Sequence, residues 1–176
     1  AVSLTGVTRQ ERRSVTDNPS DPACADPRPK RAAPVLDAFE RNYAQVQYHY
    51  VQFLTEHLAD CARTFSGDLT KVLVLAILGQ RHIEAQILAQ KDQGADQPSA
   101  MSASRIADVT GLPRETVRRK LDALSEQGWA EQGPDRRWRI AAVDGTSTLR
   151  HDLKDLDERG LQRLARLYAN LSPLTD

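Results

Sequence analysis

The sequence lacks the signals that identify an enzyme or a metal protein. Its 176 residues contain only two cysteines, Cys24 and Cys61, and four histidines, and none of these follows a metal-ligand spacing. We interpret the cysteines as a reduced pair. The sequence also has no nucleophile elbow, no Gly-rich phosphate loop and no recognisable pair of catalytic carboxylates. We therefore expect no enzymatic activity, no metal and no cofactor.

Aromatic residues are scarce and net charge is absent. Aromatic residues make up 5% of the chain, apolar residues 40%, and the formal net charge is zero. This composition is typical of a soluble, mainly helical protein. If the chain binds a nucleic acid, the binding must depend on a local cluster of positive charge and not on the net charge. No charged-then-apolar leader is present, and no apolar run approaches the about 18 residues that span a bilayer. We expect a cytoplasmic protein without a membrane partner.

Changes in composition divide the chain into four segments. Residues 1–33 are polar and Pro-rich without a sustained period, which predicts a flexible arm. Residues 34–65 and 144–176 each carry an apolar stripe, which predicts a long helix in each. Residues 66–143 between them predict a small lobe of short elements.

The two striped helices are longer than one small core can cover. In the first, apolar residues alternate spacings of three and four from Leu36 to Phe53, a heptad-like pattern. The second begins near residues 146–148, and Gly160 within it costs about 1 kcal/mol relative to Ala and is a place where it can bend. We expect both helices to form a homodimer interface. The residues predicted at this interface are Leu36, Phe39, Tyr43, Val46, Tyr50, Leu153, Leu156, Leu164 and Leu167.

The lobe begins with a helix that is apolar on nearly every side. Residues 66–68 (SGD) break the preceding helix, and either Ser66 or Asp68 is suited to cap the next one. Apolar residues then surround the helix from Val72 to Leu78, a pattern typical of a centrally buried helix.

Two short helices and a hairpin follow. Ser102 is expected to cap the first helix, which ends at Gly111. The second begins at Pro113 and runs to about Gln127. The period then changes to two, with apolar residues alternating with arginines around the turn QGPD, which predicts a small β-hairpin over residues 129–142. Its two tryptophans are expected in the hairpin core.

The order of these elements is that of a winged helix-turn-helix. Ala107 permits a close helix crossing, Gly111 four residues later accepts a positive φ, and Val117 locks the second helix onto the first. We therefore predict a mainly α fold with a small β-hairpin wing, a winged helix-turn-helix flanked by long N- and C-terminal dimerisation helices.

The stretch GLPRETVRRKLDALSEQGW, residues 111–129, concentrates positive charge. Four of the seven residues 114–120 are basic, while Val117, Leu121 and Leu124 fall on the opposite face. Such a helix can bury one side and present the other to a major groove, where Arg reads guanine and Glu accepts from cytosine. The predicted DNA contacts, with phosphate contacts from other elements included, are Ser104, Arg114, Glu115, Thr116, Arg118, Arg119, Arg136, Arg137 and Arg139.

Residues 68–143 resemble the MarR and related winged-helix regulators of bacteria. The stretch RETVRRKLDALSEQGW is similar to their recognition helix, and Asp135-Arg136-Arg137 to their wing tip. The resemblance implies a homodimeric transcription regulator that reads a pseudo-palindrome in double-stranded DNA. It also implies an optional small phenolic effector near Tyr43 and Tyr50, but these tyrosines lie on the heptad stripe, so packing is the interpretation we favour.

Other interpretations stay open at this point. The arginines of residues 114–119 also suit a solvated surface helix, and Asp135 or Glu131 can simply pair with the wing arginines. Zero net charge and the acids Asp108, Asp122 and Glu126 around the motif suit a winged-helix adapter that binds protein and not DNA.

Overall fold

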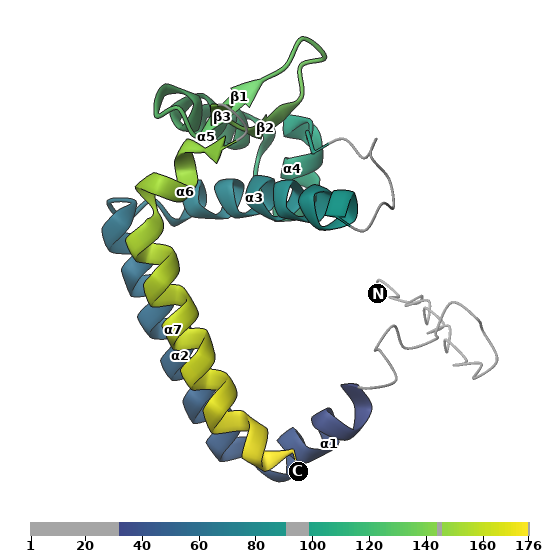
Figure 1. The fold of residues 1–176 in the computed structure, drawn as a ribbon, viewed down its shortest axis with the longest axis vertical. Coiled ribbons are helices and arrows are strands. Elements are labelled where there is room, and N and C mark those ends of the chain that lie inside the picture. The colour runs from purple at the N-terminus through teal and green to yellow at the C-terminus, as the bar shows by residue number, and fades with distance from the viewer. Residues whose placement is uncertain (1–31, 91–98, 144–145, 176) are drawn as a thin grey trace, which may run out of the picture.

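The computed structural model describes residues 32–90, 99–143 and 146–175, which form a long two-helix arm with a compact lobe at one end (Figure 1). The arm pairs α2 (Tyr43–Thr64) with α7 (Lys154–Leu171), and α1 (Ala32–Arg41) turns away at its far end. The predicted flexible arm, residues 1–33, lies outside the described residues except for Ala32 and Ala33, which begin α1.

The N-terminal stripe forms two helices, so the prediction of a single long one is wrong. The break is at Asn42, where φ is −110° and ψ is 29°. The Asn42 side-chain amide donates a hydrogen bond of 3.0 Å to the Ala38 carbonyl. An Asn side chain that binds nearby backbone competes with the helical pattern, which explains why the helix ends there. The apolar stripe therefore changes direction between Phe39 and Tyr43.

A tight turn joins the arm to α3 (Leu69–Gln90). Ser66 and Gly67 adopt positive φ angles of 53° and 83°, and the Gly67 N–H donates to the Ala62 carbonyl at 2.7 Å. Asp68 Oδ1 then accepts from the Lys71 N–H at 2.9 Å, which caps α3. Of the two predicted caps, the structure therefore uses Asp68.

The structure corrects one expectation about α3. Only Val74, Leu75 and Leu78 are buried, so most of this helix is not central. A window of 18 residues within it has a mean hydropathy of 1.3, enough by length and composition alone to cross a membrane, although polar residues interrupt its apolar runs. In the described chain, α4, α5 and β2 pack against α3.

The lobe elements agree closely with the sequence. Ser102 Oγ accepts from the Arg105 N–H at 3.2 Å and caps α4 (Ala103–Thr110), and Gly111 ends this helix with φ of 68°. The next helix, α5 (Arg114–Glu126), is followed by Gly128 with φ of 72°. Left-handed backbone at both glycines explains why these helices end there.

Two strands form the predicted hairpin. β1 (Ala130–Gln132) pairs antiparallel with β2 (Trp138–Ile140), with Ala130 opposite Ile140. On the other edge of β2, Met101 exchanges two backbone hydrogen bonds with Trp138, at 2.8 and 2.7 Å. The mostly helical chain and its small antiparallel hairpin make this a winged helix-turn-helix.

The C-terminal stripe is also interrupted, so one long helix was the wrong prediction. A short antiparallel pair, β3 (Ala142–Val143) and β4 (Thr146–Ser147), precedes α6 (Thr148–Asp152). Leu153, with φ of −102° and ψ of 12°, separates α6 from α7, and the short helix η2 (Ser172–Leu174) follows.

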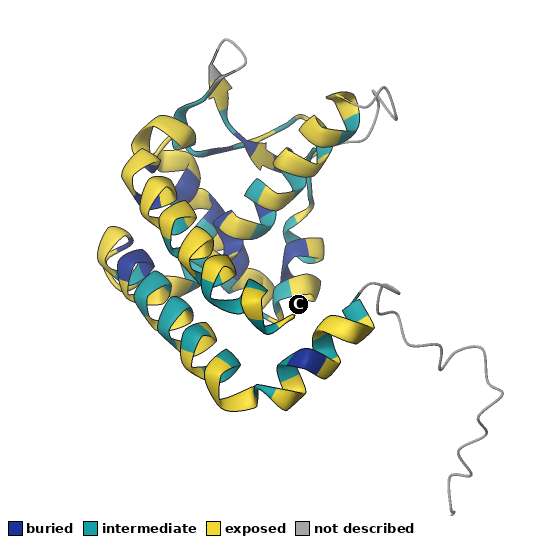
Figure 2. Ribbon diagram, turned by 60° about the horizontal axis from the view of Figure 1, so that its bottom comes forward, coloured by how far each residue is buried: buried dark blue, intermediate teal, exposed yellow. Residues whose placement is uncertain are grey.

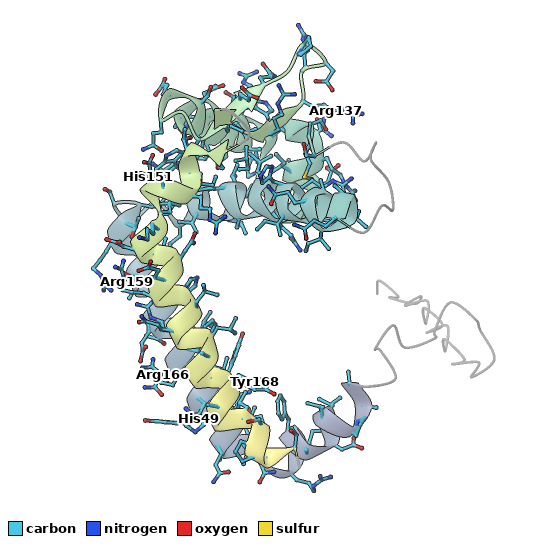
Figure 3. The ribbon with its side chains drawn as sticks, in the orientation of Figure 1. His49, Arg137, His151, Arg159, Arg166 and Tyr168 are labelled. Carbon is cyan, nitrogen blue, oxygen red and sulfur yellow. The ribbon has the colours of Figure 1, made fainter. Side chains whose placement is uncertain are left out.

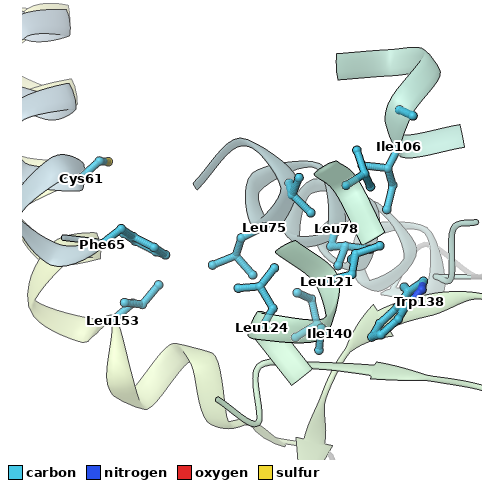
Figure 4. Packing of buried hydrophobic residues seen from close by; sticks show 14 of the residues in the cluster. Cys61, Phe65, Leu75, Leu78, Ile106, Leu121, Leu124, Trp138, Ile140 and Leu153 are labelled. Atoms are coloured by element: carbon cyan, nitrogen blue, oxygen red, sulfur yellow. The ribbon is translucent and has the colours of Figure 1, made fainter. Parts of the chain in front are cut away.

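The core lies between α3, α5 and the hairpin and reaches the top of the arm (Figure 4). Val117, Leu121 and Leu124 of α5 have no exposed surface, which confirms the predicted inward face. Leu153 and Leu156 pack in the same core at 9% and 8% exposure. This corrects their assignment to a dimer interface, because their own chain already covers them.

An ionic cluster joins the two helices of the arm. Asp60 of α2 is almost fully buried, and its carboxylate accepts hydrogen bonds from Arg159 Nε at 2.8 Å and Arg163 Nη2 at 2.7 Å, both from α7. The hydrogen bond from Arg159 holds the pKa of Asp60 well below its usual range, burial opposes this, and Arg163 adds to the lowering. The cluster fixes how α7 lies on α2.

Candidate nucleic-acid interface

The turn between α4 and α5 has the geometry predicted from three residues. Ala107 is 5% exposed, Gly111 has a positive φ, and Val117 is fully buried. A Cβ at Gly111 would meet no atom within 4 Å, so the backbone angle and not space requires glycine. Thr110 Oγ1 donates to the Ile106 carbonyl at 2.7 Å and so supports the end of α4. The turn therefore sets the direction of α5.

The charged face of α5 points away from the core. Arg114, Glu115, Arg118 and Arg119 are all exposed, whereas Thr116 is half-buried. Arg118 Nη2 lies 2.9 Å from Glu115 Oε2, one helical turn away. The pair is largely exposed on both sides, so the interaction is weak and easily exchanged.

One basic residue of this stretch has a structural task. Lys120 Nζ donates to Asp68 Oδ2 at 2.7 Å and so ties α5 to the cap of α3. Burial raises the pKa of Asp68, but the hydrogen bonds from Lys120 and from the Lys71 N–H outweigh it, and the pKa lies below its ordinary value. The spacing of residues 114–120 gave no sign of this contact, because its partner lies 52 residues away.

The wing tip carries three arginines in different settings. Arg136 is exposed and has a positive φ of 60°. Arg139 Nε pairs with Glu131 Oε1 across the hairpin at 2.6 Å, and Arg137 Nε lies 3.7 Å from Asp135 Oδ2. The acids named as alternative partners of the wing arginines therefore do contact two of them. Both pairs are about half exposed, so they are available for exchange with another anion.

The predicted DNA contacts thus come from three elements, namely α4, α5 and the hairpin. Ser104 on α4 is half-buried, like Thr116. Figure 3 shows the Arg137 side chain on the side of the wing that faces α4, where it shares a cavity with Ser102 and Arg105. Arg105 was not among the predicted residues, although its place in the first turn of α4 was a signal for it.

The predicted dimer residues divide by exposure. Tyr43, Tyr50 and Leu164 are exposed at 66%, 47% and 52%. Half-buried members are Leu36, Phe39, Val46 and Leu167. Further exposed apolar side chains on the arm, which the heptad pattern missed, are Tyr48, Val51, Leu161 and Tyr168. Tyr48 and Val51 lie on α2 between the positions of the heptad stripe, so a pattern that follows one face of the helix does not include them.

The remaining predictions concern tryptophans, acids and metal ligands. Trp138 lies in the core as predicted, while Trp129 is half-buried at its edge and donates from Nε1 to Asp152 Oδ2 at 2.8 Å. The acids that favour an adapter, Asp108, Asp122 and Glu126, are exposed on the lobe. Across residues 32–90, 99–143 and 146–175, no group of three or more His, Cys, Asp or Glu side chains is placed to hold a metal.

Comparison with known families matches residues 95–134 to the IclR helix-turn-helix domain. These residues include α4, the turn, α5 and β1, and among them α5 presents the exposed Arg114, Arg118 and Arg119, whereas the wing arginines lie beyond the match. The chain is therefore a helix-turn-helix, DNA-binding transcription regulator. IclR is a different family from MarR, so the match does not confirm the MarR-like resemblance. No curated protein and no solved structure matches the chain.

Proposed function

We propose that this regulator acts in the bacterial cytoplasm as a MarR-like homodimer that binds a pseudo-palindromic operator. In this proposal residues 66–143 form the DNA-binding domain, and residues 34–65 and 144–176 supply the dimerisation helices. The observation that carries it is the pairing of a fully buried face on α5 with an opposite face of exposed guanidinium groups. A helix held this firmly can present its side chains to a groove without losing its position.

The N-terminal half of α5 enters the major groove in this proposal. Arg114, Arg118 and Arg119 are then available to donate to guanine O6 and N7, and Glu115 to accept from cytosine N4. Each good base contact contributes about 1–3 kcal/mol of discrimination between base pairs. The ion pair between Arg118 and Glu115 helps to orient both side chains before DNA arrives.

Phosphates and the minor groove take the other contacts. Arg136, Arg137 and Arg139 on the wing over residues 129–142 reach the backbone or an adjacent minor groove, while Ser104 and Thr116 donate to phosphates. The pairs that Arg137 and Arg139 make with wing acids are solvent-exposed and contribute little, so a phosphate can replace the acid. Because salt screens distant charges, a phosphate responds mainly to these nearby arginines. The zero net charge of the whole chain therefore does not prevent DNA binding.

The arm supplies the dimer interface in this proposal. Exposed apolar residues follow both of its helices, and the ribbon in Figure 2 marks many residues along them as exposed. The residues we assign to the interface are Leu36, Phe39, Tyr43, Val46, Tyr48, Tyr50, Val51, Leu161, Leu164, Leu167 and Tyr168. Extended apolar surface of this kind is rare on monomers and marks association. Two copies then place their α5 helices about 34 Å apart, one turn of DNA.

A second candidate function is a winged-helix adapter that binds protein. The observation in its favour is that Arg118, Arg137 and Arg139 each contact an acid of their own chain. Measuring affinity at several salt concentrations distinguishes the two functions. Each phosphate contact releases a counterion, so affinity for DNA falls steeply as salt rises. A protein complex of the adapter kind would respond far less to salt.

Selection of bound sequences from random duplex DNA tests the proposed function directly. We expect enrichment of a two-fold symmetric site with half-sites about one helical turn apart, and affinity for it that falls steeply between 50 and about 200 mM salt. Recovery of no preferred sequence, together with salt-independent capture of a protein partner, would establish the adapter instead.

A further inference from the structure

Two connections join the lobe to the arm, and the helix is broken at both of them (Figure 1). At the first, Ser66 and Gly67 adopt positive φ angles between α2 and α3. At the second, Leu153 separates α6 from α7 with φ of −102° and ψ of 12°. No continuous helix therefore runs from the arm into the lobe, and the orientation of the lobe depends on contacts that side chains make at these connections.

Trp129 lies next to the first connection. It follows Gly128, which ends α5, and precedes β1, so its backbone belongs to the lobe. Its carbonyl accepts from the Ala141 N–H at 3.0 Å. Its ring packs edge-on against Phe65 at the end of α2, with 5.7 Å between the ring centroids and 67° between the planes. Phe65 is 4% exposed, so Trp129 meets a ring that is held in the core.

Trp129 also holds the second connection. Its Nε1 donates to Asp152 Oδ2 at 2.8 Å, and Asp152 is the last residue of α6, directly before the break at Leu153. The hydrogen bond from Trp129 is the main cause that lowers the pKa of Asp152, and a contact with His151 adds to it. The acceptor is a carboxylate, and such a hydrogen bond is about twice as strong as one between neutral groups.

The start of α6 is held against the same turn. Thr148 Oγ1 donates to the Gly128 carbonyl at 2.8 Å. With Thr148 at one end and Asp152 at the other, α6 is bound at both ends to the residues that follow α5. The position from which α7 leaves the lobe is therefore fixed relative to the end of α5.

The apolar contacts at the junction fix the orientation less sharply. Leu153 and Leu156 pack in the core that reaches the top of the arm, and Figure 4 shows Phe65 and Leu153 directed into it. Hydrophobic burial has no preferred direction, so it keeps the lobe on the arm but tolerates small rotations. A hydrogen bond weakens steeply as it bends, so the bond from Trp129 to Asp152 opposes such rotations.

We propose that Trp129 fixes the orientation of α5 on the arm, through its hydrogen bond to Asp152 and its ring contact with Phe65. The consequence for DNA, which rests on the proposed function, is selectivity for the spacing between half-sites. Successive base pairs lie about 3.4 Å apart and turn by about 35° around the duplex axis. Two α5 helices held at a fixed angle fit one spacing, whereas helices free to turn also fit the neighbouring ones. Trp129 thus contributes to operator specificity without contacting a base.

Distances between spin labels test the orientation without DNA. Asp122→Cys on α5 and Gln162→Cys on α7 place the labels at exposed positions. Cys24→Ser removes one native thiol, and Cys61 is 4% exposed, so its thiol is shielded from the label. Labelled chains are diluted with unlabelled ones so that each labelled dimer carries one pair. We expect a narrow distribution of distances in the labelled chain without further substitution.

Two variants remove the hydrogen bond from opposite sides. Trp129→Phe keeps an aromatic ring beside Phe65 but lacks the N–H donor, and Asp152→Ala lacks the acceptor. Both should broaden the distribution, whereas Asp152→Asn, whose amide oxygen still accepts, should keep it narrow. His151→Ala is the matched control, because it removes another contact of the same carboxylate and leaves the bond from Trp129. Thermal melting shows that each variant is folded. Distributions that stay narrow in both Trp129→Phe and Asp152→Ala would overturn the proposal.

A series of duplexes tests the effect on spacing. It contains the selected operator and versions with base pairs added or removed between the half-sites. We expect Trp129→Phe to reduce the ratio of affinities between the best and the next spacing by about five- to tenfold, as for one partly exposed hydrogen bond. Affinity for a single half-site should not change, because every residue of α5 is retained. An unchanged ratio in a variant with a broader distribution of distances would overturn the effect on spacing.

The two measurements keep this proposal apart from the proposed function. If the wild-type chain selects no DNA site, the operator function fails, and the distance distributions still decide whether Trp129 fixes the lobe. If a sharp spacing preference persists in folded Trp129→Phe and its distances stay narrow, the operator function stands and the role of Trp129 is overturned.

Discussion

Glu115 and Arg118 lie one turn apart on α5, and their side chains form an ion pair with 2.9 Å between Oε2 and Nη2. Arg118 therefore has a partner of its own chain at the surface that we expect to meet DNA, while Arg119 lies next to it, also exposed. Because both members of the pair are more than half exposed, water screens it, and it contributes at most about 1 kcal/mol. A guanine edge competes easily with such a partner.

Removal of either guanidinium should abolish operator preference. We expect Arg118→Ala and Arg119→Ala each to lower the affinity for the selected operator by about 1–3 kcal/mol, while binding to unrelated DNA falls much less. Fluorescence anisotropy with operator and scrambled duplexes measures both affinities. Arg41→Ala on α1 is the matched control. Wild-type discrimination in both variants would show that α5 does not read the operator.

Glu115→Gln should have the opposite effect on unrelated DNA. The variant removes a negative charge from the groove-facing surface and releases Arg118, so affinity for any duplex should rise while discrimination falls. The same anisotropy titrations check this. Unchanged affinity for scrambled DNA would mean that Glu115 lies far from the phosphates.

Replacement of an exposed apolar residue on α7 should separate the proposed dimer. Leu164 is 52% exposed on the arm, so Leu164→Asp should leave the fold of one chain intact but place a charge in the apolar interface. We expect the variant to be monomeric at micromolar concentration by light scattering and to bind a half-site more weakly than the wild-type dimer binds the whole site. A wild-type protein that is already monomeric would refute the dimer.

The buried cluster of the arm predicts loss of stability in acid. The pKa of Asp60 is lowered in the folded chain, so the unfolded chain takes up its proton first as pH falls. The stability due to Asp60 is complete above its unfolded pKa near about 4 and is lost as pH falls through the lower folded value. Denaturation at a series of pH values measures it.

Asp60→Asn isolates this contribution. It should cost about 3–5 kcal/mol near neutral pH, because Arg163, whose side chain is only 12% exposed, loses its closer charged partner and keeps only Glu56 at 3.8 Å. It should also flatten the acid dependence below about pH 4. If the free energy of unfolding of the variant falls with pH as steeply as that of the wild type, other carboxylates cause the loss of stability in acid.

A pair of glycine substitutions tests the turn. Gly111→Ala places a side chain at φ of 68° and should destabilise the chain by about 1–2 kcal/mol, although no atom blocks the added carbon. Gly79→Ala within α3 has equal space and no positive φ, so it should stabilise by about 0.5–1 kcal/mol. Chemical denaturation of both variants gives the comparison. If the two substitutions change the free energy of unfolding equally, the positive φ does not explain why residue 111 is glycine.

The sequence by itself determined the elements of the lobe, since each depends on residues a few positions apart. The cap at Ser102, the turns at Gly111 and Gly128, and the inward residues Val117 and Leu121 were all predictable from local hydrogen bonds, backbone angles and helical spacing. The breaks at Asn42 and Leu153 were missed because an apolar pattern can continue while the helix does not.

Only the tertiary structure decided which faces meet. Lys120 finds Asp68 across 52 residues and Arg163 finds Asp60 across 103, and no local spacing indicates either pair. The same holds for Leu153 and Leu156, which the fold places in the core and not at a partner, and for the cavity that gathers Arg81, Arg105 and Arg137. Periodicity shows that a face is apolar or charged, but the return path of the chain determines what covers it.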